Sequence, residues 1–100
     1  MPSSAIDLIV RERERQIVDE GFTAEHDDCE RRGEFVRAAS AYALVSNRKV
    51  LGDQVRTQIP WPWDPSWWKP SEDPIRNLVK AGALIVAEIE RIQRAQEASA

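Results

Sequence analysis

The 100-residue sequence has one cysteine, one histidine and four glycines, and it contains no long apolar run. Cys29 alone cannot form a disulfide within the chain, and it has no second cysteine with which to build a zinc knuckle. A membrane-spanning helix needs roughly 18–20 apolar residues, and the N-terminus lacks the apolar core and cleavage site of a secretory signal. We therefore expect a cytoplasmic protein that does not bind membranes.

An excess of positive charge is also missing, because 14 Lys and Arg residues face 17 Asp and Glu residues, for a formal net charge of -3. Nucleic-acid-binding domains normally carry a basic excess, so nucleic acid is not an expected partner. The length fits one domain with one core. With 42% hydrophobic residues the chain can fold, and the sequence predicts a single domain over residues 1–100.

Hydrophobic spacing predicts three main helices, at residues 4–20, 33–46 and 73–96, and hence an all-α fold of three to four helices. Ser4 and Asp7 resemble a capping box, and Gly21 is a natural helix stop. The predicted core side of the first helix consists of Ile6, Ile9, Val10, Arg13 and Ile17. Its predicted solvated side carries Arg11, Glu12, Glu14 and Arg15.

Between the first two helices, Thr23 can cap a short turn that begins at Ala24. The second helix has an apolar stripe made of Phe35, Val36, Ala39, Tyr42 and Ala43. Residues 47–72 form the connection to the last helix, as a loop that crosses the helices. Within this loop, residues 47–59 fit a helical turn, a strand pair about Gly52 and Asp53, or an exposed loop equally well.

The last helix begins with Asp73 as N-cap and Pro74 at its first position, and its tail over about 96–100 is expected to fray. Alternating steps of three and four predict a coiled-coil-like seam of Ile75, Leu78, Gly82, Ile85, Ile89, Ile92 and Gln96, widened by Val79 and Val86. A helix that is apolar on more than one side predicts a homo-oligomer joined through residues 75–92. The alternative is a monomer in which the tryptophan loop covers the second face. Gly82 itself indicates either a close helix contact or access for a ligand.

All four tryptophans lie within one segment, PWPWDPSWWKP at 60–70, whose four prolines forbid a regular helix. Four neighbouring tryptophans either close the core as a lid or form a recognition surface on which a planar ring stacks. Nearby cations would bind an anionic part of such a ligand, and His26 and Asp28 would hydrogen-bond to it. The predicted ligand-binding residues are Trp61, Trp63, Trp67, Trp68, Lys69, Arg76, Lys80, His26 and Asp28.

Carboxylates surround the only histidine in the string Glu25-His26-Asp27-Asp28, which Glu30 and Glu34 follow. The first interpretation is capping and ion pairing with Arg31 and Arg32, and ligand contact is the second. The third is a magnesium site, with Asp27 and Glu34 as weak candidates. The spacing matches no specific zinc motif.

The chain resembles a small, functionally uncharacterised family of bacteriophage and prophage proteins in the strings ERERQIVDEGFTAEHDD, GEFVRAASAYAL, WPWDPSWWKP and RNLVKAGALIVAEIER. The resemblance covers most of residues 11–92 and implies a phage protein in the cytoplasm of a host cell. A fainter similarity, in Arg15-Gln16, Glu20-Gly21-Phe22 and Asp27-Asp28, links it to the ryanodine-receptor-type repeat, whose bacterial forms look like sensors or binders.

The favoured hypothesis is a non-catalytic binding module, without cofactor, that sequesters a nucleotide-like ligand or blocks a host defence component. An alternative is a magnesium-dependent, all-helical nucleotide pyrophosphohydrolase similar to MazG, with carboxylates from Glu30, Glu34, Glu88 and Glu90, together with Asp27 or Asp28. Against it, Glu88 and Glu90 are two positions apart and point about 200° away from each other on a helix. A further alternative is an inhibitor that blocks a host enzyme by direct protein contact.

Overall fold

The computed structural model describes residues 4–46 and 59–99. They form, in chain order, α1 (Ala5–Asp19), α2 (Ala24–Asp27), α3 (Glu34–Leu44), the 3-10 helix η2 (Pro65–Trp67) and α5 (Pro74–Ser99). No strand occurs in these two stretches, so the predicted all-α class is confirmed. The undecided stretch at 47–59 lies outside the described residues except for its last position.

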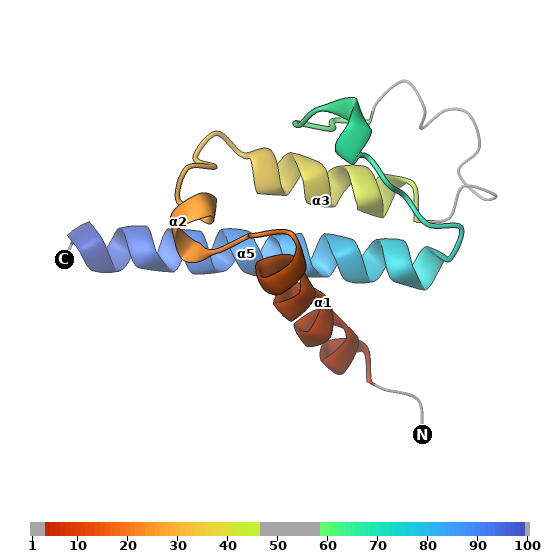
Figure 1. Cartoon of the computed structure of the whole chain (residues 1–100), viewed down its shortest axis with the longest axis horizontal. Helices are drawn as coiled ribbons and strands as arrows, with labels where there is room; N and C mark the ends of the chain where they lie inside the picture. Colours follow the sequence, from red (N-terminus) through yellow and green to blue (C-terminus); the bar gives the residue numbers. More distant parts are fainter. Residues whose placement is uncertain (1–3, 47–58, 100) are drawn as a thin grey trace.

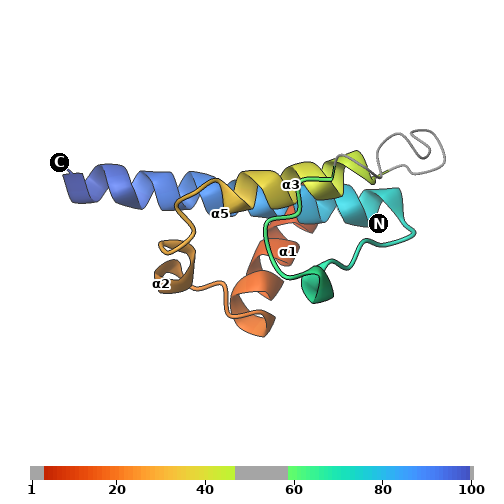
Figure 2. The same cartoon turned by 90° about the horizontal axis from the view of Figure 1, so that it is seen from above.

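α5 is the longest element, and the other helices pack along it (Figure 1). α3 lies beside α5 and runs antiparallel to it, whereas α1 crosses α5 steeply and α2 sits near its C-terminal half. Figure 2 shows the same arrangement from above, with the segment that contains η2 on the side of α1 and α2. Within the described chain, no helix is long and apolar enough to cross a membrane.

The helix ends follow the sequence signals closely. Ser4 Oγ accepts a hydrogen bond of 3.1 Å from the backbone N–H of Asp7, as the capping motif predicts. Gly21, at a φ of 74°, ends α1 and lets the backbone N–H of Phe22 donate to the carbonyl of Gln16 at 3.0 Å. At the start of α5, Asp73 Oδ1 accepts from the N–H of Ile75 at 2.9 Å. α5 is helical to Ser99, and the expected fraying over about 96–100 stays a prediction.

The core lies between α3 and α5. Its buried residues are Phe35, Ala38, Ala39, Tyr42, Ala81, Leu84 and Ala87. Alanines make up most of this interface, so the two helix backbones can approach closely. Phe22, Trp61, Trp63 and Trp68 pack against the same core from its edge, and the Trp-rich segment therefore closes the core on one side.

Two predicted helix faces are wrong in detail. On α1, the buried residues are Glu12, Arg13 and Gln16, whereas Ile6, Val10 and Ile17 remain exposed. On α3, the predicted stripe holds for Phe35, Ala39 and Tyr42, but Val36 and Ala43 face outward. The reason in α1 is that charged side chains form ion pairs inside the fold, which a hydrophobicity pattern does not register.

The predicted seam on α5 is not the face that packs within the described chain. Ile75, Leu78, Ile85, Ile89 and Ile92 are all exposed large hydrophobics. The buried positions are Asn77, Val79, Ala81, Ala83, Leu84 and Ala87. Three of these six are alanines, which allow a neighbouring helix to approach closely. Gly82 serves the close helix contact, since a Cβ there would lie 2.9 Å from Ile9 Cδ1 of α1.

Candidate functional site

A cavity of about 670 Å³ is bounded by residues of α1, α3, α5 and the Trp-rich segment. Its volume falls in the range of small-molecule sites, about 300–1,000 Å³. Seven of the nine predicted ligand-binding residues line it, namely His26, Trp61, Trp63, Trp67, Lys69, Arg76 and Lys80. The other two, Trp68 and Asp28, are not part of the lining. The structure thus brings together residues that lie more than fifty positions apart.

Three of the tryptophans form an aromatic wall that rests on α3. The ring of Trp61 lies 5.3 Å from that of Trp63 and 4.8 Å from that of Trp68, and Trp68 lies 4.9 Å from Tyr42. Trp61 Nε1 donates to the carbonyl oxygen of Asp64 at 3.0 Å. These three indoles are packed against the core, as the first of the two alternatives for the tryptophans expects.

Trp67 differs from the other three because it is 63% exposed at the cavity. It ends η2, whose first turn is held by Asp64, since Asp64 Oδ1 accepts from the N–H of Ser66 at 2.8 Å. The hydrogen bonds to Ser66 lower the pKa of Asp64. An open indole on a tightly turned segment is a stacking surface that needs little ordering when a ring binds.

Lys80 of α5 is held between the Trp-rich segment and α3. Its Nζ donates to the carbonyl oxygen of Lys69 at 2.9 Å and lies 5.3 Å from the centre of the Tyr42 ring, a cation–π contact. Burial, and then the positive charge of Arg76, lower the pKa of Lys80. The ammonium group is therefore partly dehydrated, which disfavours its charged form. An anion that enters the cavity would offset this loss of hydration.

A buried carboxylate connects α1 to α5 at the same cavity. Glu12 accepts two hydrogen bonds of 2.8 Å from Arg15, and it forms an ion pair of 2.7 Å with Arg76. Burial by itself would raise the pKa of Glu12, but the hydrogen bonds from Arg15 and Arg76 outweigh burial and lower it. Arg15 also pairs with Glu20 at 2.7 Å. The hydrogen bonds that Arg15 donates to Glu12 raise the pKa of Arg15 further, so this network is charged at neutral pH.

The predicted solvated side of α1 is therefore wrong at Glu12 and Arg15, which line the cavity. Arg11 and Glu14 are exposed, as predicted. The sequence does hold a signal for the difference: Glu12 and Gln16 are one turn apart, so they share a face, and both lie in α1 on the flank of Ile9. This signal is weak, because a charged residue beside an apolar one looks like a surface residue. Only the structure shows that Arg76 lies opposite Glu12.

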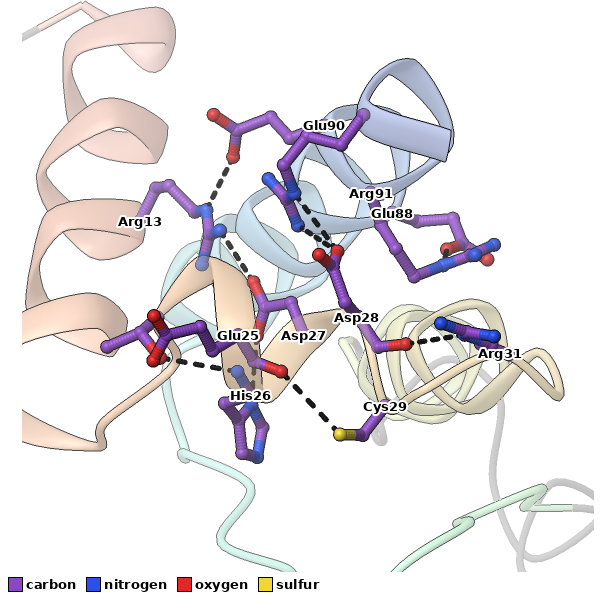
Figure 3. Close-up of polar contacts among 12 residues, drawn as sticks. Arg13, Glu25, His26, Asp27, Asp28, Cys29, Arg31, Glu88, Glu90 and Arg91 are labelled. Atoms are coloured by element: carbon purple, nitrogen blue, oxygen red, sulfur yellow. Dashed lines mark hydrogen bonds and ion pairs between the residues drawn. The ribbon is translucent and has the colours of Figure 1, made fainter. Parts of the chain in front are cut away.

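His26 and Asp27 form a polar pair in α2, close to α1 and α5 (Figure 3). Asp27 is fully buried, and its two carboxylate oxygens contact His26 Nδ1 at 2.9 Å and Arg13 Nη2 at 2.8 Å. Arg13 in turn reaches Glu90 at 2.8 Å. The ring of His26 stacks on Phe22 at 4.8 Å. Asp27 thereby fixes the orientation of His26, whose Nε2 lies 3.8 Å from Glu30 beside the cavity.

Asp28 has a structural role on the other side of α2. Its carboxylate pairs with Arg94 at 2.9 Å, and its backbone carbonyl accepts from Arg31. The two weak magnesium candidates are engaged separately, Asp27 by Arg13 and His26 and Glu34 by the N–H of Arg32. In the part of the chain that the structure describes, no three His, Cys, Asp or Glu residues are grouped as for a metal ion.

Two buried polar atoms of cavity-lining residues have no hydrogen-bond partner among the described residues. They are Gln16 Oε1 and Trp63 Nε1, and Gln16 as a whole is only 3% exposed. Burial and the neighbouring Glu34 raise the pKa of Glu30, and Trp63 partly offsets this shift. The indole N–H and the Glu30 carboxylate nevertheless lack the geometry of a hydrogen bond. Buried polar groups are normally paired, so an acceptor and a donor are left over just beneath the lining of this cavity.

A scan against protein-family models, a search of curated proteins and a search of solved structures each found no match for this chain. The function therefore has to be argued from the cavity itself. Its chemistry consists of an open indole, two lysines, an oriented histidine, and an unpaired acceptor and donor.

Proposed function

We propose that this protein is a non-catalytic binding module that sequesters a planar, nucleotide-like ligand in the tryptophan-lined cavity. The observation that carries the proposal is the exposed ring of Trp67, which lines one cavity together with Lys69 and Lys80. A nucleobase edge presents hydrogen-bond donors and acceptors side by side. Such an edge would also pair with Gln16 Oε1 and Trp63 Nε1, two buried atoms of lining residues without a partner among the described residues, once small side-chain movements open them to the cavity.

The exposed ring of Trp67 supplies the stacking surface for the proposed ligand. Stacking of a base on an aromatic side chain contributes about 1–3 kcal/mol. Trp61 and Trp63 add an apolar wall whose position is already fixed by packing on the core. A planar ring would thus meet a prearranged site, so less binding energy is lost in ordering the protein.

Lys69 and Lys80 are the groups that favour an anionic part of the ligand. Neither forms an ion pair within the described residues, whereas Arg15 and Arg76 are both engaged by Glu12. Lys80 is partly dehydrated, and a phosphate would restore a strong partner to it. The proposed ligand therefore carries its negative charge at the end of the cavity that holds the two lysines.

The resemblance of most of residues 11–92 to a phage-borne family supports a role for this binding in phage infection. A small phage protein that binds a nucleotide without converting it would remove a host signal from the cytoplasm of the infected cell. Blocking of a host defence component would then follow from sequestration of its nucleotide signal.

Tryptophan fluorescence tests the proposal directly. The purified protein is titrated with mononucleotides, 3′,5′-cyclic mononucleotides and cyclic dinucleotides, and at least one class is expected to change the emission with saturation. Trp67→Ala should weaken that binding by about 5- to 150-fold, in keeping with a stacking loss of about 1–3 kcal/mol. Val18→Ala, on the exposed surface of α1 outside the cavity, is the matched control. No response to any member of the panel would refute the proposal.

A further inference from the structure

Glu30 differs from the other carboxylates that line the cavity. Glu12 and Glu20 are paired with arginine side chains, and Asp64 accepts a hydrogen bond from a backbone N–H. The Glu30 side chain is 17% exposed, and its Oε1 lies 3.8 Å from Nε2 of His26, beyond the length of a hydrogen bond. Glu30 therefore keeps acceptor capacity that a bound ligand can use.

The indole N–H of Trp63 lies beside this carboxylate, just beneath the lining of the cavity. It has no hydrogen-bond partner among the described residues, so a small side-chain movement would make a donor available. Burial and the carboxyl group of Glu34 raise the pKa of Glu30, whereas Trp63 lowers it. The charged form of Glu30 is thus short of stabilising partners, and ligand donors would supply them. Two acceptor oxygens and one donor N–H are adjacent here.

A row of aromatic rings separates this group from the lysines. The distances between successive ring centres are 6.1 Å, 5.3 Å and 5.6 Å along Phe22, Trp63, Trp61 and Tyr42. His26, next to Glu30, stacks on Phe22 at one end of the row, and Lys80 Nζ lies 5.3 Å from the Tyr42 ring at the other. A nucleotide whose phosphate reaches the lysines would therefore present its base edge to Glu30 and Trp63.

Guanine has the base edge that matches this arrangement. Its N1–H and N2–H₂ groups are adjacent donors, which one carboxylate can accept together as a bidentate pair. Its O6, next to them on the same edge, accepts a hydrogen bond from an N–H. Adenine and cytosine present one donor beside an acceptor on this edge, so one oxygen of an ionised carboxylate would face a ring nitrogen without a proton between them.

We propose that Glu30 makes the cavity selective for guanine nucleotides, an inference that rests on the proposed nucleotide-binding function. The two oxygens of Glu30 accept from N1–H and N2–H₂, and the N–H of Trp63 donates to O6. The lysines at the other end bind the phosphate. A site built from such charge-assisted hydrogen bonds rejects a base that leaves one of them unpaired.

The first test compares matched pairs of nucleotides by calorimetric titration of the full chain. The pairs are GMP with AMP, 3′,5′-cyclic GMP with 3′,5′-cyclic AMP, and cyclic di-GMP with cyclic di-AMP. In whichever class binds, the guanine member should bind about 5- to 150-fold more tightly, the discrimination that one bidentate contact usually gives. The inosine counterpart, which lacks the N2 amino group, should fall between the two.

Glu30→Gln separates recognition of the base from a structural role. The variant keeps the shape of the side chain but replaces one acceptor oxygen with an NH₂ donor. Its amide matches a donor beside an acceptor, so binding of the adenine member should rise and the guanine preference should fall at least about 5-fold. Loss of a merely structural side chain would weaken both members equally. Glu25→Gln, at an exposed position outside the cavity, is the matched control and should keep the preference.

The outcomes distinguish this inference from the proposed function. Adenine nucleotides that bind as tightly as guanine nucleotides would overturn the inference and leave the binding function intact. A guanine preference that survives in Glu30→Gln, with helical circular dichroism unchanged, would also overturn it. If no member of any pair binds, the proposed function fails and the inference fails with it.

Discussion

Arg76 of α5 and Glu12 of α1 form a 2.7 Å ion pair at the cavity, and Arg13 of α1 forms a second ion pair with Glu90 of α5. Arg15 binds the Glu12 carboxylate through two hydrogen bonds of 2.8 Å. A single buried carboxylate thus determines where two of the cavity's cations lie. The network holds the α1 wall of the cavity in place, and its removal is expected to affect both stability and shape.

We expect Glu12→Gln to lower the free energy of unfolding by about 1–3 kcal/mol, the usual loss when charged hydrogen bonds are removed from a buried site. The loss stays below that of a fully buried pair because Arg15 and Arg76 are partly exposed and can bind water instead. Urea denaturation at pH 7 measures it. Glu14→Gln, at an exposed position of the same helix, should change the free energy of unfolding by less than about 0.5 kcal/mol, as is usual for surface substitutions.

The same carboxylate gives a pH dependence with a definite sign. The pKa of Glu12 is lower in the folded protein than in the unfolded chain. Its contribution to stability is therefore fully present above the unfolded pKa, about 4.3, and is lost as the pH falls through the folded pKa. The wild type should lose more stability between pH 5 and the acid limit than Glu12→Gln does. Parallel stability curves for the two proteins would contradict the assignment.

Asp27 is expected to be more sensitive than Glu12, because it is fully buried and joins Arg13 to His26. Asp27→Ala should cost about 3–5 kcal/mol, since it leaves the buried guanidinium of Arg13 with one partner fewer. Glu25→Ala, at an exposed position of the same short helix, is the control. A loss below 1 kcal/mol for Asp27→Ala in thermal or urea denaturation would show that α2 is not held by this ion pair.

The contact between Gly82 and Ile9 predicts a measurable coupling between the two positions. Gly82→Ala should gain about 1 kcal/mol of helix propensity, but its new Cβ would lie 2.9 Å from Ile9 Cδ1. In an Ile9→Val background, which lacks that methyl group, the gain should be larger by about 0.5–1.5 kcal/mol. A double-mutant cycle measured by urea denaturation tests this. Strict additivity would mean that α1 does not press on α5 at Gly82.

A substitution of Gln16 distinguishes a role in ligand binding from a role in stability. Gln16→Met keeps the side-chain length and removes an unpaired buried acceptor, so the free energy of unfolding should stay the same or rise by about 1 kcal/mol. Ligand binding should nevertheless weaken about 10-fold, because one hydrogen bond to the base edge is lost. Calorimetric titration with whichever nucleotide binds the wild type, beside a urea denaturation curve, gives both quantities. A variant that loses stability and binding in parallel would indicate a merely structural side chain.

The helices and their ends could be predicted because their signals are local. Ser4, Gly21 and Asp73 act on backbone groups within a few residues, and the structure shows each of them acting as expected. For the tryptophans the sequence left a lid and a recognition surface open, and the structure packs Trp61, Trp63 and Trp68 against the core while Trp67 stays exposed. Seven of the nine predicted site residues lie at one cavity.

The faces of α1 and α5 could not be predicted, because they depend on what lies opposite. Glu12 reads as a surface residue until Arg76 is placed beside it across 64 positions of sequence. On α5, isoleucines at heptad spacing indicate a core, yet the small residues Ala81 and Ala87 form the contact with α3. A hydrophobicity pattern assigns large apolar side chains to the core. Two closely packed helices, however, need small side chains at their contact.

The most direct test of the account follows the four indole N–H signals of the tryptophans in a ¹H–¹⁵N correlation spectrum, assigned by single Trp→Phe variants, while the binding nucleotide is added. Trp61 already donates to Asp64, whereas the N–H of Trp63 has no partner among the described residues. The account predicts that the Trp63 signal moves downfield as it gains a hydrogen bond, that the Trp67 signal shifts by ring stacking, and that the Trp61 signal stays nearly unchanged. Saturable binding that leaves the Trp63 and Trp67 signals in place would contradict it.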